Sequence, residues 1–280
     1  MEWKGRRGSR NIEDRRGASL GRAGGVGGVG VIAVLLIGYF LGIDVTPLLN
    51  DPGTGSGAPT EITAADRAAG EFVSVTLADT EEVWAGLFRT QVGATYQPVT
   101  LVLYKDATQS ACGGASGATG PFYCPGDRKV YLDTAFFTTL EQRLGAHGDF
   151  ASAYVVAHEV AHHVQDELGI LGRANQLRQQ VSEAESNAIS VRIELQADCF
   201  SGIWARGASE QFGSINQGDL EEAVNAARQI GDDTLQRNAG QRPMPHTFTH
   251  GTSEQRSRWF VQGYKSGKLD QCDTFSTDRL

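Results

Sequence analysis

The chain has 280 residues, a net charge of −8 and one strong motif, which suits a single sizeable domain with accessory segments. The charge is uneven, because residues 1–22 hold seven basic and three acidic side chains and the remainder therefore carries −12. An acidic body argues against nucleic acid as a partner.

The N-terminal residues predict a membrane anchor. Residues 1–22 are rich in Gly, Arg and Ser and nearly free of apolar side chains, which is typical of disorder. Residues 23–43 carry no charge and are long enough for one transmembrane helix. Because the basic residues precede this helix, we expect a single-pass membrane protein with a cytoplasmic N-terminus and an extracytoplasmic domain. A cleaved signal peptide is the alternative, but no small-residue cleavage site follows the apolar run.

Residues 44–60 are predicted to be a flexible linker, and residues 61–280 a mostly helical domain with a small β-sheet, class α+β. A Gly-rich loop is expected over residues 105–128. Apolar spacing and helix formers predict helices at residues 61–93, 134–145, 149–167, 173–206 and 219–235, and a last one between a capping box at Thr252–Gln255 and Gly267. β-Branched runs predict strands at residues 98–104 and 129–133.

The strongest motif is H-E-x-x-H, formed by His158, Glu159 and His162. On a helix the two imidazoles lie four residues apart on one face, which is the separation needed to bind one Zn²⁺. Glu159 could then accept a proton from a metal-bound water without being a ligand. The flanking residues are apolar nearly all round, so the helix should be buried rather than a charged surface helix with a chance match.

A catalytic zinc needs a third protein ligand, and Glu194 is the best candidate. Glu194 and Asp198 are four residues apart and share a helix face, so Asp198 could accept the second ring N–H of a ligand histidine. Glu183 and Glu185 are rival ligands, but their polar neighbours favour exposure.

A second polar cluster lies just before the last predicted helix. We prefer His250 over His246 as a group that stabilises an oxyanion, because it sits beside a helix N-terminus. His147 and His163 carry no comparable signal.

The four cysteines allow three disulfide pairings. No two of the cysteines have C-x-x-C spacing. We favour Cys112–Cys124, which closes the Gly-rich loop, and Cys199–Cys272, which ties the C-terminal tail to the core. Disulfides would indicate an oxidising compartment; four free buried thiols are the alternative.

Together these stretches resemble the bacterial neutral zinc metallopeptidase family of the YpfJ type. The similarity is carried by Trp3–Gly17, Cys112–Asp127, His158–Gln165, Glu194–Cys199 and His250–Arg256. The resemblance implies a zincin-like peptidase anchored in the bacterial cell membrane, with a third-ligand pattern similar to that of gluzincins.

The segment from Thr249 to Arg256 is also similar to one in HtpX-like membrane peptidases. That resemblance implies that His250 lines the active site and that Arg256 buttresses it. On the same analogy, Lys129–Asp133 would be an edge strand that pairs with an extended substrate, which makes Tyr131 a substrate-binding residue.

These features predict a zinc-dependent endopeptidase acting on peptide or protein substrates, with Glu159 as general base and His250 as the second catalytic residue. Two alternatives remain. One is a non-catalytic envelope scaffold or binding protein stabilised by the metal, and the other is a zinc amidase that acts on cell-wall material.

Overall fold

The computed structural model describes residues 1–17, 61–116 and 119–280. Its helices are α3 (Ala64–Leu87), α4 (Ala135–Gln142), α5 (Asp149–Glu167), α6 (Ile170–Arg178), α7 (Glu183–Phe212), α8 (Gln217–Gln229), α9 (Asp232–Asn238) and α10 (Ser253–Ser266). Its strands are β1 (Ile12–Asp14), β2 (Thr100–Tyr104), β3 (Ala107–Ser110), β4 (Gly113–Ser116), β5 (Phe122–Cys124) and β6 (Lys129–Asp133). Single turns of other helix types lie at η1 (Phe88–Val92), η3 (Pro245–Thr247) and η4 (Leu269–Cys272).

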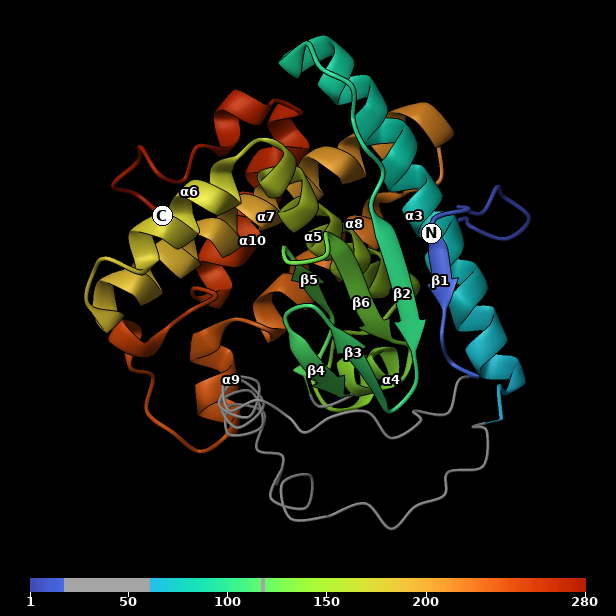
Figure 1. The fold of residues 1–280 in the computed structure, drawn as a ribbon, viewed down its shortest axis with the longest axis horizontal. Coiled ribbons are helices and arrows are strands. Elements are labelled where there is room, and N and C mark those ends of the chain that lie inside the picture. Colours follow the sequence, from blue (N-terminus) through green and yellow to red (C-terminus); the bar gives the residue numbers. More distant parts are fainter. Residues whose placement is uncertain (18–60, 117–118) are drawn as a thin grey trace.

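The central sheet has the order β1-β2-β6-β5, with β5 antiparallel to its neighbour and the other pairs parallel. Alternate residues of each strand face opposite sides. Leu101 and Leu103 of β2 belong to the large core shared with the helices, whereas Val102 and Tyr104 pack in a smaller cluster with Ala115 of β4. Helices therefore cover one face of the sheet and the β3–β4 hairpin covers the other (Figure 1).

Residues 1–17 are folded onto the domain, in contrast to the disorder predicted for residues 1–22. β1 pairs with β2, and Arg6 forms two hydrogen bonds of 2.7 Å with Asp79 of α3. Asn11 donates to Glu81 of the same helix. Arg6, Arg7, Arg15 and Arg16 thus find carboxylate partners within the protein, and these charge-assisted hydrogen bonds help to offset the entropy lost when the segment is ordered.

The predicted fold class requires a correction, although its mostly helical α+β part agrees with the structure. No helix within the described residues is both long and apolar enough to cross a membrane. The predicted span at residues 23–43 lies outside them. Moreover, a single crossing at that point would put residues 1–17 and the domain on opposite sides of a bilayer, whereas β1 and β2 are hydrogen-bonded neighbours. The predicted transmembrane helix is therefore not supported by the structure.

The helix predicted over residues 173–206 is in fact two helices. α6 ends at Arg178, and α7 begins after Ser182, whose side chain accepts from the backbone N–H of Glu185 while Glu185 accepts from Ser182 in return. This reciprocal capping box starts a new helix and makes the break favourable. The capping box at Thr252 and the left-handed C-cap at Gly267, both predicted, are confirmed on α10.

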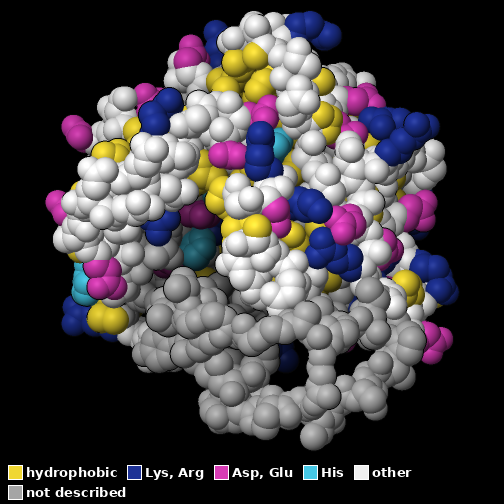
Figure 2. Space-filling view, in the orientation of Figure 1, with side chains coloured by type: hydrophobic (Ala, Val, Ile, Leu, Met, Phe, Trp, Pro, Cys, Tyr) yellow, Lys and Arg dark blue, Asp and Glu magenta, His cyan; other side chains and the backbone are white. Residues whose placement is uncertain are grey.

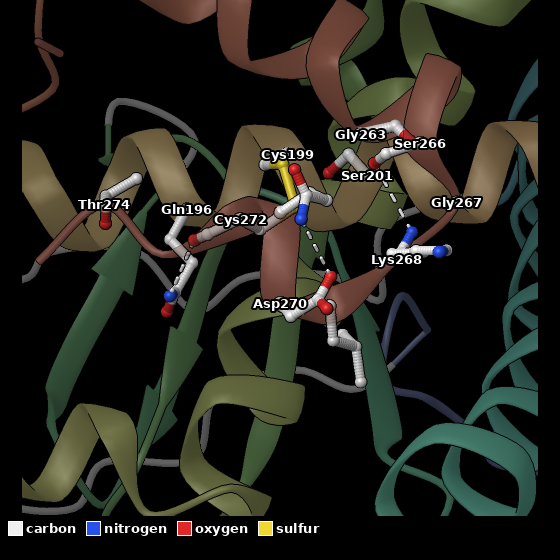
Figure 3. Close-up of a disulfide and its surroundings, with 12 residues drawn as sticks. Gln196, Cys199, Ser201, Gly263, Ser266, Gly267, Lys268, Asp270, Cys272 and Thr274 are labelled. Carbon is white, nitrogen blue, oxygen red and sulfur yellow. Dashed lines mark hydrogen bonds between the residues drawn. A yellow bond between two sulfur atoms is a disulfide. The ribbon is translucent and has the colours of Figure 1, made fainter. Parts of the chain in front are cut away.

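α7 and α10 pack closely because glycines lie at their crossing. A Cβ atom added at Gly263 would lie 1.8 Å from the carbonyl oxygen of Cys199, and one added at Gly202 would lie 2.0 Å from the carbonyl oxygen of Phe260. The disulfide Cys199–Cys272 ties the chain after α10 back to α7, and Gln196 donates to the Cys272 carbonyl (Figure 3). Both favoured disulfide pairings are confirmed, since Cys112 bonds Cys124.

Gly263→Ala should force α7 and α10 apart and lower the stability by about 3 kcal/mol, because the added methyl group overlaps rigid backbone. The melting temperature should fall by roughly 10 °C. Gly86→Ala is the matched control, since a Cβ there meets nothing within 4 Å and Ala favours a helix. An unchanged melting temperature for Gly263→Ala would contradict the close crossing.

Candidate metal centre

The motif helix α5 is buried, as its apolar flanks predicted, and it contacts α3, α7 and α8. His158 and His162 leave the same face of this helix, with their ring centroids 4.9 Å apart. Both side chains keep a small exposed fraction of 8% and 12%, so this face looks into solvent-accessible space.

α7 brings Glu194 to the two imidazoles. Glu194 Oε2 lies 3.0 Å from His158 Nε2, and Glu194 Oε1 lies 3.5 Å from His162 Nε2. Two ligand atoms of a tetrahedral zinc, each at a bond length near 2.0–2.1 Å, are roughly 3.3 Å apart. The donor set and its spacing therefore fit a zinc ion. The rivals Glu183 and Glu185 are exposed at the start of α7, where Glu185 serves the capping box.

The charges of this cluster are compatible with a cation. Burial by itself would raise the pKa of Glu194, but the neighbouring imidazoles hold it well below its usual range. Glu194 is therefore an anion beside two nitrogen donors, which is the state a metal ligand requires.

A buried ion pair lies behind the cluster. Arg256 of α10 donates from Nε to Asp198 Oδ2 at 2.9 Å and from Nη2 to Asp198 Oδ1 at 3.0 Å. Tyr154 of α5 donates its hydroxyl hydrogen to Asp198 Oδ1 and accepts from Arg256 Nη2. Asp198 Oδ1 also lies 3.0 Å from His158 Nδ1, although this ring nitrogen is not aligned for a hydrogen bond in this conformation. Asp198 thus contacts the far side of a predicted ligand, and Arg256 balances its charge.

The metal-ligand candidates lie in a cleft of about 550 Å³. Its walls include the apolar side chains Phe122, Phe136, Leu144, Leu171, Ile193 and Leu235. In Figure 2 a hollow opens left of the centre, with histidine and acidic side chains at its bottom. Glu159 lines this cleft beside His158, and burial raises the pKa of its carboxyl group.

His250 also lines the cleft, with about half of its side chain exposed. Asp232 holds it there, because Asp232 Oδ2 accepts from the backbone N–H groups of Thr249, His250 and Gly251 while Oδ1 lies 3.2 Å from His250 Nδ1. Burial alone would lower the pKa of His250, but Asp232 and Glu194 raise it. His246 does not line the cleft.

The structure corrects the predicted edge strand. β6 lies inside the sheet between β2 and β5, so Lys129–Asp133 offers no free edge. Tyr131 is 1% exposed, stacks on Phe122 and donates to Asp127, and it does not line the cleft. The free edge next to the cleft belongs to β5, whose Phe122 and Tyr123 line it.

Sequence reasoning missed three parts of this site. β5 was hidden in the predicted Gly-rich loop, although its short Phe-Tyr-Cys run was a weak strand signal. Tyr154 is one of the flanking residues of the motif helix, and its position there predicts burial but not the contact of its hydroxyl with Asp198. Asp232 gave no local signal, because its partners follow 17 to 19 residues later in the chain.

Two histidines on one helix turn, a glutamate from a second helix and a further glutamate beside the first histidine make a centre of the zinc-hydrolase type. The chain belongs to the family described as "Putative neutral zinc metallopeptidase", whose sequence model matches residues 1–275.

The chain is also similar to individual proteins of other organisms. The chain is 46% identical over 285 residues to "Uncharacterized protein YpfJ" of Escherichia coli (strain K12), which covers 98% of this chain and 99% of that protein. It is 44% identical over 188 residues to "Uncharacterized protein Rv2575" of Mycobacterium tuberculosis (strain ATCC 25618 / H37Rv), covering 64% of this chain and 62% of that protein. No solved structure matches the chain.

Asp198→Asn should weaken zinc binding by about 10- to 100-fold, because a neutral amide supports the His158 ring less well than a carboxylate. It should also lower the melting temperature, since Arg256 loses its buried counter-charge. Competition with a chromogenic chelator would measure the affinity. Glu183→Gln, on the exposed start of the same helix, should change neither value; wild-type affinity in a folded Asp198→Asn protein would rule out this role.

Proposed function

We propose that this protein is a zinc-dependent peptidase that hydrolyses peptide bonds with Glu159 as general base. The observation that carries the proposal is the meeting of His158, His162 and Glu194 from two helices at the floor of an open cleft, with Glu159 beside them. A metal held only for stability would not need a free carboxylate at that place or access from solvent.

His158, His162 and Glu194 would hold the ion. When bound, zinc acts as a Lewis acid that polarises the scissile carbonyl and lowers the pKa of a water toward about 7. Glu159 accepts the proton of the attacking water, and its raised pKa suits a group that must next release this proton to the leaving amine.

Other side chains position the reaction. His250, oriented by Asp232, stabilises the negative charge that develops on the carbonyl oxygen. Asp198 and Arg256 hold the ring of His158 in place. The free edge of β5 binds the substrate as an additional strand, and the apolar walls accept its side chains. The two disulfides favour an oxidising compartment as the place of action.

Glu159→Gln should keep the fold and bind zinc stoichiometrically while turnover of a peptide library falls by about 10²- to 10⁴-fold. Wild-type cleavage should stop with 1,10-phenanthroline and return with added Zn²⁺. Mass spectrometry of the products and metal analysis of both proteins provide the measurements. Full activity of Glu159→Gln would exclude it as the base.

The same experiment separates the alternative functions. Stoichiometric zinc without any chelator-sensitive cleavage would favour a metal-stabilised scaffold. Release of amine from cell-wall fragments, with intact proteins left uncut, would favour an amidase. The open cleft with an edge strand suits an extended peptide better than either alternative.

His250→Ala should lower kcat by about 10²-fold and leave KM nearly unchanged, because the lost interaction forms mainly in the transition state. His246→Ala is the matched control, since it removes a histidine of the same segment that does not line the cleft. Equal kinetics of the two variants would remove His250 from the mechanism.

A further inference from the structure

One wall of the cleft is a face of α6. Leu171, Asn175 and Arg178 line the cleft, and their spacing of four and three residues puts them on the same side of the helix. Leu171 is buried, Asn175 is partly buried and Arg178 is exposed. The wall therefore changes from apolar inside the cleft to cationic at its rim.

The guanidinium of Arg178 is held by neutral groups only. Its Nε donates to Ser186 Oγ at 3.2 Å and its Nη1 donates to Asn175 Oδ1 at 3.2 Å. No ion pair joins Arg178 to a carboxylate among the described residues. The other arginine that lines the cleft, Arg256, is buried and neutralised by Asp198. Arg178 thus brings an uncompensated positive charge to the cleft.

The remaining donors of Arg178 have the geometry for a carboxylate. Two of the five guanidinium N–H groups already donate to Ser186 and Asn175. Nη1 and Nη2 keep N–H groups that can donate two parallel hydrogen bonds to the two oxygens of a carboxylate. Because Ser186 and Asn175 already fix the side chain, less conformational entropy is lost on binding. The whole chain carries a net charge of −8, so a cation at the rim gives an anionic group a local attraction that offsets this overall repulsion.

Two residues close to Arg178 in the chain are exposed apolar side chains. Leu177 and Val181 are 52% and 38% exposed, and they are two of the four large apolar side chains that are exposed among the described residues.

We infer that Arg178 forms a subsite for a carboxylate group of the peptide substrate. This inference rests on the proposed peptidase function and narrows its preferred substrates to peptides that place an acidic group at the rim of the cleft. The carboxylate can be an Asp or Glu side chain or the C-terminus of the peptide, and both present the same two oxygens to the guanidinium.

The test is peptide binding to zinc-loaded, full-length Glu159→Gln protein, measured by fluorescence anisotropy. Three fluorescent peptides share one apolar sequence. The first is neutral, with a Gln side chain and an amidated C-terminus. The second has Glu in place of this Gln, and the third keeps Gln but has a free C-terminal carboxylate. A carboxylate at the right place should tighten binding about threefold to tenfold. The peptide that binds more tightly than the neutral one shows whether the site binds an acidic side chain or the C-terminal carboxylate.

When Arg178→Gln is added, the peptides with and without the carboxylate should bind with about equal affinity, and the affinity for the neutral peptide should not change. Adding Arg173→Gln, which removes an exposed arginine of the same helix that does not line the cleft, should leave the gain intact. The subsite is excluded if neither carboxylate helps, if the gain survives Arg178→Gln, or if Arg173→Gln abolishes it equally.

Cleavage of the unlabelled peptides by wild-type protein is measured alongside. Cleavage without a carboxylate preference in binding would remove the subsite and leave the peptidase proposal standing. A carboxylate preference in binding that depends on Arg178, found without any cleavage, would support the binding site and contradict the peptidase proposal.

Discussion

The buried ion pair between Asp198 and Arg256 is the contact on which the candidate metal centre depends. It joins α7 to α10, and Tyr154 extends it to α5. Removing one member of such a pair leaves an uncompensated charge in the interior, at a cost of about 3–5 kcal/mol. Because Glu194 lies one helix turn before Asp198, the same pair sets the position at which Glu194 meets the motif helix.

The uneven charge of the chain has an internal explanation. The basic N-terminal segment lies along α3, where Asp79 and Glu81 accept its hydrogen bonds, and β1 completes one edge of the sheet. A basic end followed by an apolar run has the pattern of a membrane topology signal. In the described part of this segment, Arg6 and Arg7 instead pair with carboxylates of α3, so this part of the positive charge is matched within the domain.

The opposite edge strand of the sheet, β5, lines the cleft. β5 is only three residues long, yet the Cys112–Cys124 disulfide and its pairing with β6 hold it in place. Tyr123 adds a third support, because its hydroxyl donates to Asp166 near the end of α5. The free strand edge and the metal-ligand candidates are thus attached to the same helix, which fixes their relative position.

The sequence by itself determined the features that depend on neighbours along one helix. The spacing of His158 and His162, the shared face of Glu194 and Asp198, and the caps of α10 follow from helix geometry within a few residues. The tertiary structure decided which strand is the edge, which carboxylate orients His250 and where residues 1–17 belong. Those outcomes depend on the packing of segments that are far apart in the chain. The free energy of this packing cannot be inferred from a short stretch of neighbouring residues.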